Sequence, residues 1–316
     1  MSFTSLLSTI ATLALLLAAG VVAGRLGIVD ETSSAKLSTL IVKIGQPFLI
    51  VNALIGLEPS AENIKSGFLI LLLGLAIHVV MALLAYVFAK PIRGFDERKL
   101  TEFGMLFTNC GFIGFPILEA VFGETGLFYG AFYVVSFHLF TWTWGISILA
   151  RGRDDIRITP KKALVNFGTI PSLIGIVLFL SGIGNHLPTF VTDFSGYVAG
   201  LCTPISMLIT GANLSRRGLR SMLTNPSVYL TNAVRLIVIP ITVTLAMWLV
   251  GLPDYMVVFG CIMSAMPTAA VITMFGEMYG ISPGCAAELV GSTSLMSVVT
   301  LLPVIRFAEF LCMHRL

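Results

Sequence analysis

The chain has 316 residues, of which 56% are hydrophobic and 11% charged, with a formal net charge of +3. A soluble domain carries about 25% charged residues, so this composition, with a mean hydropathy of +0.96, excludes an ordinary soluble protein. The small positive charge does not indicate a nucleic-acid partner, because the basic residues lie mostly in loops between long apolar runs. The expected partner of most of the surface is the lipid bilayer.

The apolar runs predict an all-α fold that crosses the membrane ten times. A spanning helix needs about 20 apolar residues, and the runs lack the alternation typical of a membrane β-barrel. The first run has no preceding Lys or Arg, so we expect a span there and not a cleaved signal peptide. The predicted spans are 3–25, 35–56, 66–89, 99–122, 125–150, 166–183, 193–213, 227–250, 255–278 and 284–311.

The distribution of Lys and Arg predicts the orientation. Fourteen of the 19 basic residues lie in the loops after spans one, three, five and seven. The positive-inside rule places these loops in the cytoplasm. We therefore expect a multi-pass protein of the cell membrane with both termini outside.

The longest polar loop, RGRDDIRITPKK (151–162), leaves five predicted spans on each side. Because five is odd, two copies of one unit would cross the membrane in opposite directions. The predicted organisation is a first five-helix repeat over 1–150, a cytoplasmic basic linker over 151–165 and a second, inverted repeat over 166–316.

Spans four and nine contain helix breakers at corresponding places in the two halves. Span four carries Gly111, Gly114 and Pro116, and span nine carries Pro267. Relative to Ala, an interior Gly costs about 1 kcal/mol and an interior Pro about 3 kcal/mol in a helix. The pattern predicts two broken helices that meet near the bilayer midplane, where inverted-repeat transporters bind substrate. The alternative is a pair of kinks that serve packing alone.

A half-helix that begins inside the membrane presents free N–H groups and a positive dipole end, which favour an anion. Asn109 could cap such a half-helix or donate its amide to a carboxylate, and hydroxyls are available in span nine. The candidate substrate-binding residues are Asn109, Cys110, Gly111, Gly114, Pro116, Ser264, Pro267 and Thr268.

Charged or titratable side chains inside the spans are candidates for charge binding or coupling, because a charge at mid-membrane costs about 2.5–3.5 kcal/mol. Arg235 could hold an anion or pair with Glu288, and His78 and His138 could relay protons. The alternatives are a structural ion pair for Arg235 and hydrogen-bonded interhelical histidines. Lys43 lies near a span end, where its amine could reach the interface.

Two common enzyme signatures are missing. The chain contains neither GxxxxGK[ST] nor HExxH, and its five Cys show no CxxC spacing. We expect no catalytic residue, no metal site and no cofactor. Coupling to H⁺ or to Na⁺ is left open.

Four stretches follow one another in a specific order over nearly the whole chain: GRLGIVDETSSAKLSTLIVKIGQPFLI (24–50), NCGFIGFPILEAVFG (109–123), AMPTAAVITMFGEMYGISP (265–283) and STSLMSVVTLLP (292–303). This pattern resembles the auxin efflux carrier family, which holds plant auxin exporters and bacterial carriers linked to malate and malonate. The resemblance implies a ten-helix inverted-repeat fold with a scaffold domain and a crossover domain. It also implies substrate near Asn109, a crossover Pro at Pro267, and a homodimer.

The chain departs from the plant pattern in two places. Thr108 stands where the plant members have a Pro before the Asn, and no long central hydrophilic loop is present. Auxin itself is therefore not assured as the substrate.

We expect a secondary transporter of a small organic anion, either a monocarboxylate or a dicarboxylate, that works by alternating access. The alternatives are a sodium-coupled carrier like the bile-acid symporters and a passive channel or facilitator.

Overall fold

The computed structural model describes residues 3–153, 156, 165–217 and 225–314. Within these residues the chain forms helices and no strand, which confirms the all-α prediction. Most of the basic linker predicted at 151–165 lies outside the described residues.

The helices of the first half of the chain are α1 (Phe3–Arg25), α2 (Glu31–Leu40), η1 (Ile41–Gly45), α3 (Gln46–Ile55), α4 (Ala61–Ala89), α5 (Phe95–Leu106), α6 (Gly114–Phe122), α7 (Glu124–Phe140), η2 (Thr141–Gly145) and α8 (Ile146–Ala150). Those of the second half are α10 (Thr169–Leu180), η3 (Ile183–His186), α11 (Thr189–Gly200), α12 (Cys202–Arg217), α14 (Pro226–Ala233), η4 (Val234–Val238), α15 (Ile239–Leu249), α16 (Asp254–Ala265), α17 (Val271–Tyr279) and α18 (Pro283–Met313). η1, η2 and η4 are π-helical turns inside longer helices.

Seven helical segments are long and apolar enough to cross a membrane, which supports a multi-pass membrane protein. These segments are Thr4–Arg25, Glu31–Ile55, Ala61–Ala89, Glu124–Ala150, Thr189–Arg216, Pro226–Leu249 and Gly284–Met313. Thr169–Leu180 and Asp254–Ala265 are apolar but shorter. The predicted total of ten spans stays a prediction.

Polar residues begin two of the long helices. The Asp30 carboxylate accepts a 2.7 Å hydrogen bond from Ser33 N and forms a capping box with Ser33 at the start of α2. The hydrogen bonds from Ser33 hold the pKa of Asp30 below its ordinary value. Ser60 caps α4 by accepting from Asn63 N over 3.1 Å. These caps fix where each helix leaves its loop.

Both predicted helix breaks are present. Non-helical residues separate α5 from α6 and α16 from α17. The sequence pattern counted Pro116 among the residues that break the helix. It does not break one, because it lies in the first turn of α6. There its missing N–H would have no intrahelical partner in any case. The break itself runs from Phe107 to Ile113.

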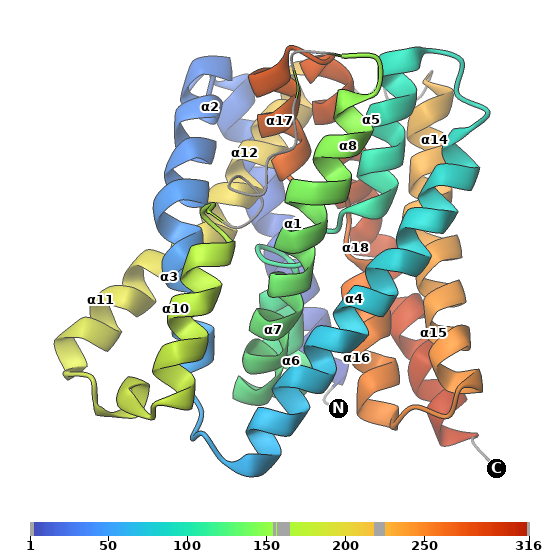
Figure 1. Ribbon diagram of the computed structural model, residues 1–316. Coiled ribbons are helices and arrows are strands. Elements are labelled where there is room, and N and C mark those ends of the chain that lie inside the picture. Colours follow the sequence, from blue (N-terminus) through green and yellow to red (C-terminus); the bar gives the residue numbers. More distant parts are fainter. Residues whose placement is uncertain (1–2, 154–155, 157–164, 218–224, 315–316) are drawn as a thin grey trace.

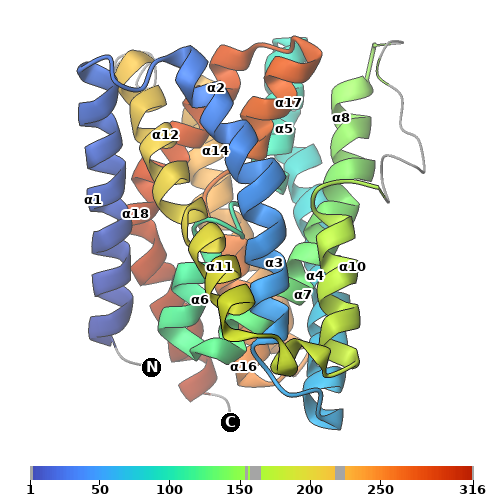
Figure 2. The ribbon, with the colours of Figure 1, turned by 90° about the vertical axis from the view of Figure 1, so that its left-hand side faces the viewer.

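We group the helices by whether they belong with the two broken helices. One group, which we call the panel, consists of α1, α2, η1, α3, α10, η3, α11 and α12; the other, the crossing group, holds the two broken helices and consists of α4 to α8 and α14 to α18, with the turns η2 and η4. Figure 2 shows the panel on the face turned to the viewer, and Figure 1 shows both chain ends at the same end of the molecule. The sidedness in the membrane stays a prediction.

Within the panel, α1 packs closely on α12 through glycines. A Cβ atom at Gly20 or at Gly211 would overlap the backbone of the opposite helix, at Leu208 O and Leu17 O respectively. The Gly-rich end of the first predicted span is therefore buried inside one chain. It is not free to pack against a second copy.

Candidate functional site

The two helix breaks cross and pair with each other. Asn109 N donates to Pro267 O over 2.7 Å, and Ala269 N donates to Phe107 O over 2.9 Å. These bonds form a short antiparallel bridge between Thr108 and Thr268. Backbone groups freed inside a membrane protein need such partners, because lipid offers none.

Thr268 fastens this crossing to its neighbours. Its hydroxyl donates to Gly104 O over 2.9 Å, and its backbone N donates to Thr293 Oγ1 over 3.1 Å. The side chain is fully buried. Thr268 therefore fastens the crossing to α5 and α18.

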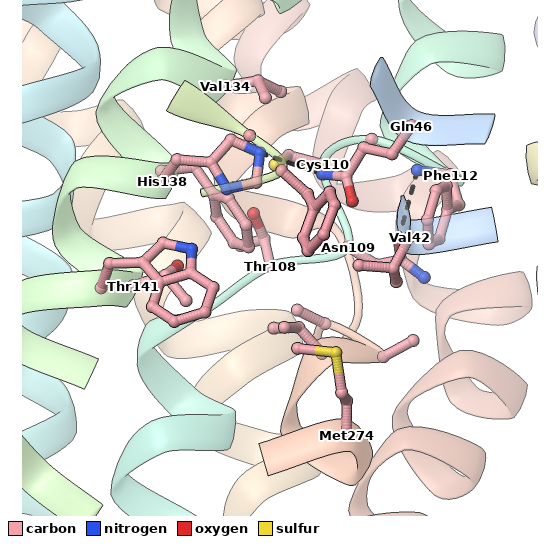
Figure 3. Close-up of a pocket in the computed structure, with 18 of the residues that line it drawn as sticks. Val42, Gln46, Thr108, Asn109, Cys110, Phe112, Val134, His138, Thr141 and Met274 are labelled. Carbon is pink, nitrogen blue, oxygen red and sulfur yellow. Dashed lines mark hydrogen bonds between the residues drawn. The ribbon is translucent and has the colours of Figure 1, made fainter. Parts of the chain in front are cut away.

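A cavity of about 210 Å³ lies beside the crossing, between the panel and the crossing group. The panel supplies residues of α2, η1 and α3 together with Phe167 and Gly168, and the crossing group supplies the α5–α6 break, α7, η2 and the start of α17 (Figure 3). The lining residues are Thr39, Val42, Lys43, Gln46, Thr108, Asn109, Cys110, Gly111, Phe112, Val134, Phe137, His138, Thr141, Trp142, Phe167, Gly168, Ala269, Ala270, Val271 and Met274.

Three of the eight predicted substrate-binding residues line this cavity, namely Asn109, Cys110 and Gly111. The other five are not among the lining residues, and the structure gives several of them other contacts. The Ser264 hydroxyl, for example, donates to Cys261 O over 3.1 Å. The residues outside the lining are Gly114, Pro116, Ser264, Pro267 and Thr268.

Asn109 presents an unused amide at the cavity. Its Oδ1 accepts from Phe112 N over 3.3 Å, which identifies the oxygen, and its Nδ2 has no hydrogen-bond partner although the residue is only 4% exposed. An unpaired buried donor costs about 1–3 kcal/mol. Because Nδ2 itself is buried, a ligand oxygen would remove this cost only after a movement of the cavity wall that uncovers the atom.

The Asn109 turn is fixed from the panel. Thr203 Oγ1, at the start of α12, donates to Phe112 O over 2.7 Å, and Asn109 O accepts from Gly114 N over 3.1 Å. The amide is therefore held in one direction before any ligand binds.

His138 links the two helix groups across the cavity. Its Nε2 lies 2.9 Å from Gln46 Nε2; because the amide nitrogen only donates, His138 Nε2 accepts and the ring proton is on Nδ1. The ring also contacts Gly168, where a Cβ atom would overlap it. The hydrogen-bonded interhelical histidine considered for this position is present, and it lines the cavity.

Lys43 was missed as a site residue. It carries the one formal positive charge among the described lining residues, with its Nζ 5.7 Å from the centre of the Phe167 ring. Its position near a span end had indicated an interfacial lysine. The signal in the sequence was a Lys within one turn of Gln46 and Pro47, but the π-helical turn that orients it has no sequence signature.

Arg235 corrects another expectation. Its guanidinium does not pair with Glu288, whose carboxylate accepts from Asn225 Nδ2 over 3.4 Å. It also does not line the cavity. Instead it donates to backbone carbonyls behind the crossing, including Met105 O over 2.7 Å and Met266 O over 3.0 Å.

His78 is fully buried behind the cavity and does not line it. Its Nδ1 donates to Gly74 O over 2.7 Å, and its ring centre lies 5.1 Å from those of Tyr133 and Phe140. Its Nε2 has no partner among the described residues. The structure therefore does not bring His78, His138 and Arg235 together at one ligand.

Residues 5–305 match the membrane transport protein family. The chain belongs to this family. The match covers nearly the whole chain and confirms the resemblance to the auxin efflux carriers.

Two archaeal relatives cover most of the chain. An uncharacterized transporter of Methanothermobacter thermautotrophicus is 25% identical over 304 residues, which are 95% of this chain and 96% of the relative. An uncharacterized transporter of Methanocaldococcus jannaschii is 24% identical over 291 residues, or 87% of this chain and 90% of the relative. The family and both relatives support transport in place of enzymatic activity. No group of three or more potential metal ligands occurs in the described part of the chain.

Proposed function

We propose that the protein is a secondary transporter that carries a small organic anion across the cell membrane by alternating access. Family membership supports transport. The observation that supports an anion is the unpartnered, buried amide of Asn109, a residue that lines the cavity beside two crossed helix breaks. Such crossings are where inverted-repeat transporters bind substrate.

Further positive potential in the cavity comes from the backbone. Ala270 and Val271 line the cavity at the start of α17, where the positive end of the helix dipole favours an anion. Lys43 adds a formal charge at the panel side. A carboxylate between Asn109 and Lys43 would contact both groups of helices.

The remaining lining favours a monocarboxylate with an apolar body over a dicarboxylate. Phe112, Phe137, Trp142 and Phe167 supply aromatic surface, and the described lining offers one formal cation. A second carboxylate would be desolvated without a charged partner, which is costly.

The helix lengths support two inverted repeats. α5 and α16 have 12 residues each, and α6 and α17 have 9 each. The residues that follow the shorter pair, Gly123 and Gly280, have φ angles of 63° and 62°, a left-handed conformation that favours Gly. We infer a ten-span architecture in which these two broken helices are equivalent.

Alternating access requires the panel and the crossing group to move against each other. The hydrogen bonds Gln46–His138 and Thr203–Phe112 join them on the walls of the cavity. A rocking or sliding motion would break these two hydrogen bonds. The cavity would then open to the other side of the membrane.

Counterflow in proteoliposomes tests the proposal. Liposomes loaded with unlabelled indole acetate, malonate or malate should accumulate the labelled compound, with the monocarboxylate preferred. Asn109→Ala should lose most of this accumulation. Asn63→Ala is the matched control, because Asn63 lies outside the cavity and donates to Glu58 O. Unchanged counterflow in Asn109→Ala would contradict the site.

The alternatives give different results in the same system. A bifunctional thiol reagent that links Gln46→Cys to His138→Cys should halt an alternating-access transporter, whereas a channel should continue to conduct. A sodium-coupled carrier should lose uptake when choline replaces Na⁺.

A further inference from the structure

We propose that the Arg235 guanidinium is a built-in replacement for a bound metal cation at the helix crossing, so that the crossing binds no Na⁺. This inference goes beyond the proposed function, because it concerns how the crossing is charged and what can couple to transport. It rests on the surroundings of a side chain that does not touch the cavity.

Arg235 donates to backbone carbonyls from both broken helices. Its Nη1 donates to Met105 O over 2.7 Å, near the end of α5. Its Nε donates to Met266 O over 3.0 Å, and its Nη2 donates to Ser264 O, both at the end of α16. Met81 Sδ lies 3.6 Å from Nη1. We call these three carbonyl oxygens and this sulfur atom the cage of Arg235.

The charge of the cage requires a cation. The C-terminal end of a helix carries about half of a negative elementary charge on its unpaired carbonyls, so two such ends together match one positive charge. Arg235 makes no ion pair with a carboxylate in the described part of the chain. Its charge is therefore balanced by the two helix ends.

The same arrangement of carbonyls is a site for metal ions in other transporters. Unwound backbone carbonyls and the C-terminal ends of half-helices coordinate Na⁺ at midplane crossings. Here the carbonyls already accept hydrogen bonds from a fully buried guanidinium. A second cation would be repelled at close range in a medium of low dielectric constant.

The π-helical turn η4 holds this guanidinium in position. Arg235 is the second residue of that turn, and the wider turn departs from the regular helical hydrogen-bond pattern at this point. The arginine and the cavity therefore have separate tasks. Arg235 neutralises the C-terminal ends behind the crossing, while an anion can use the break and the helix start that face the cavity.

Thermal unfolding of the purified protein in detergent tests the inference without any substrate. Wild type should unfold at the same temperature in sodium chloride and in choline chloride. Arg235→Ala should unfold at a lower temperature and recover most of the loss when millimolar guanidinium chloride is added. Arg306→Ala is the matched control, because Arg306 is exposed and pairs with Glu309 over 2.8 Å. Guanidinium should not stabilise this control.

Two outcomes would overturn the inference. One is a higher unfolding temperature of the wild type in sodium chloride than in choline chloride. The other is a guanidinium-induced rise in the unfolding temperature of Arg235→Ala that is no larger than the rise for Arg306→Ala. If Arg235→Ala gives no folded protein, Arg235→Lys decides. A folded, Na⁺-indifferent Arg235→Lys supports a cation at this position, and failure of this charge-preserving variant counts against it. Since no transported substrate is used, absence of carboxylate transport would leave the result intact.

Discussion

Asn109 and Pro267 are joined by a 2.7 Å hydrogen bond from the backbone N of the first to the carbonyl of the second. One residue comes from each broken helix, so this bond places the break in the first half of the chain directly against the break in the second. Asn109 also lines the cavity, while its backbone N is occupied by this bond. The following predictions test this division of work between the crossing and the cavity.

Thr268→Val should destabilise the protein by about 1–3 kcal/mol, because it removes the hydroxyl that donates to Gly104 O and leaves a buried carbonyl unpaired. The shape of the side chain is nearly kept. The measurement is the midpoint of thermal unfolding in detergent.

The control for Thr268 is Thr143→Val, since the exposed Thr143 hydroxyl donates to Leu139 O in its own helix. This variant should unfold near the wild-type temperature. Equal midpoints for the two variants would argue against a structural role of Thr268 at the crossing.

Gly168→Ala should displace the His138 ring and break its hydrogen bond with Gln46, because the added methyl group would overlap the ring. Overpacking of this kind costs about 1–3 kcal/mol. Transport should fall together with stability. Gly196→Ala is the control, since a Cβ atom there meets no other atom within 4 Å. Full transport in Gly168→Ala would show that the ring can move without loss.

Lys43→Gln should raise the apparent KM for the anion a few-fold with little change in kcat, since a single exposed charge contributes about 0.2–1 kcal/mol. The residual difference from wild type should shrink at high ionic strength because salt screens exposed charges. Uptake at several substrate and salt concentrations measures both effects. Lys36→Gln removes a neighbouring charge outside the lining and should leave KM unchanged.

Bound substrate should slow the reaction of Thr39→Cys with a small maleimide, because Thr39 is exposed and lines the cavity. Cys312 lies near the C-terminal end of α18, outside the cavity, and serves as an internal control. Mass spectrometry of the labelled peptides gives both rates from one sample. Equal slowing at both cysteines would indicate a general stabilisation and not occupation of the cavity.

The helix breaks and Asn109 could be predicted because Gly, Pro and Asn act on the backbone near them. The roles of Ser264 and Thr268 could not, since a hydroxyl inside a membrane protein serves a ligand or a carbonyl equally well. Here both hydroxyls donate to carbonyls, and that of Thr268 reaches Gly104 in the other half of the chain.

The partners of Arg235 and the place of Lys43 in the cavity lining could not be predicted, for a related reason. Each residue lies in a π-helical turn, which rotates the following helix in a way that residue types do not indicate. The partners of Arg235 are backbone carbonyls, and every residue has one, so the sequence pointed to the carboxylate of Glu288 instead. The burial of Arg235 could be judged from the sequence, whereas the direction of its side chain could not.

The close packing of α1 against α12 means that the panel cannot be completed in the membrane until α12 has been synthesised. Gly20 faces Leu208, and Gly211 faces Leu17, so each helix completes the surface of the other. During synthesis α1 enters the membrane long before α12 is made, and until then its glycine face contacts lipid or other protein. A chain truncated after Gly200 should therefore insert its first helices yet remain open to degradation, because the panel closes only when α12 arrives.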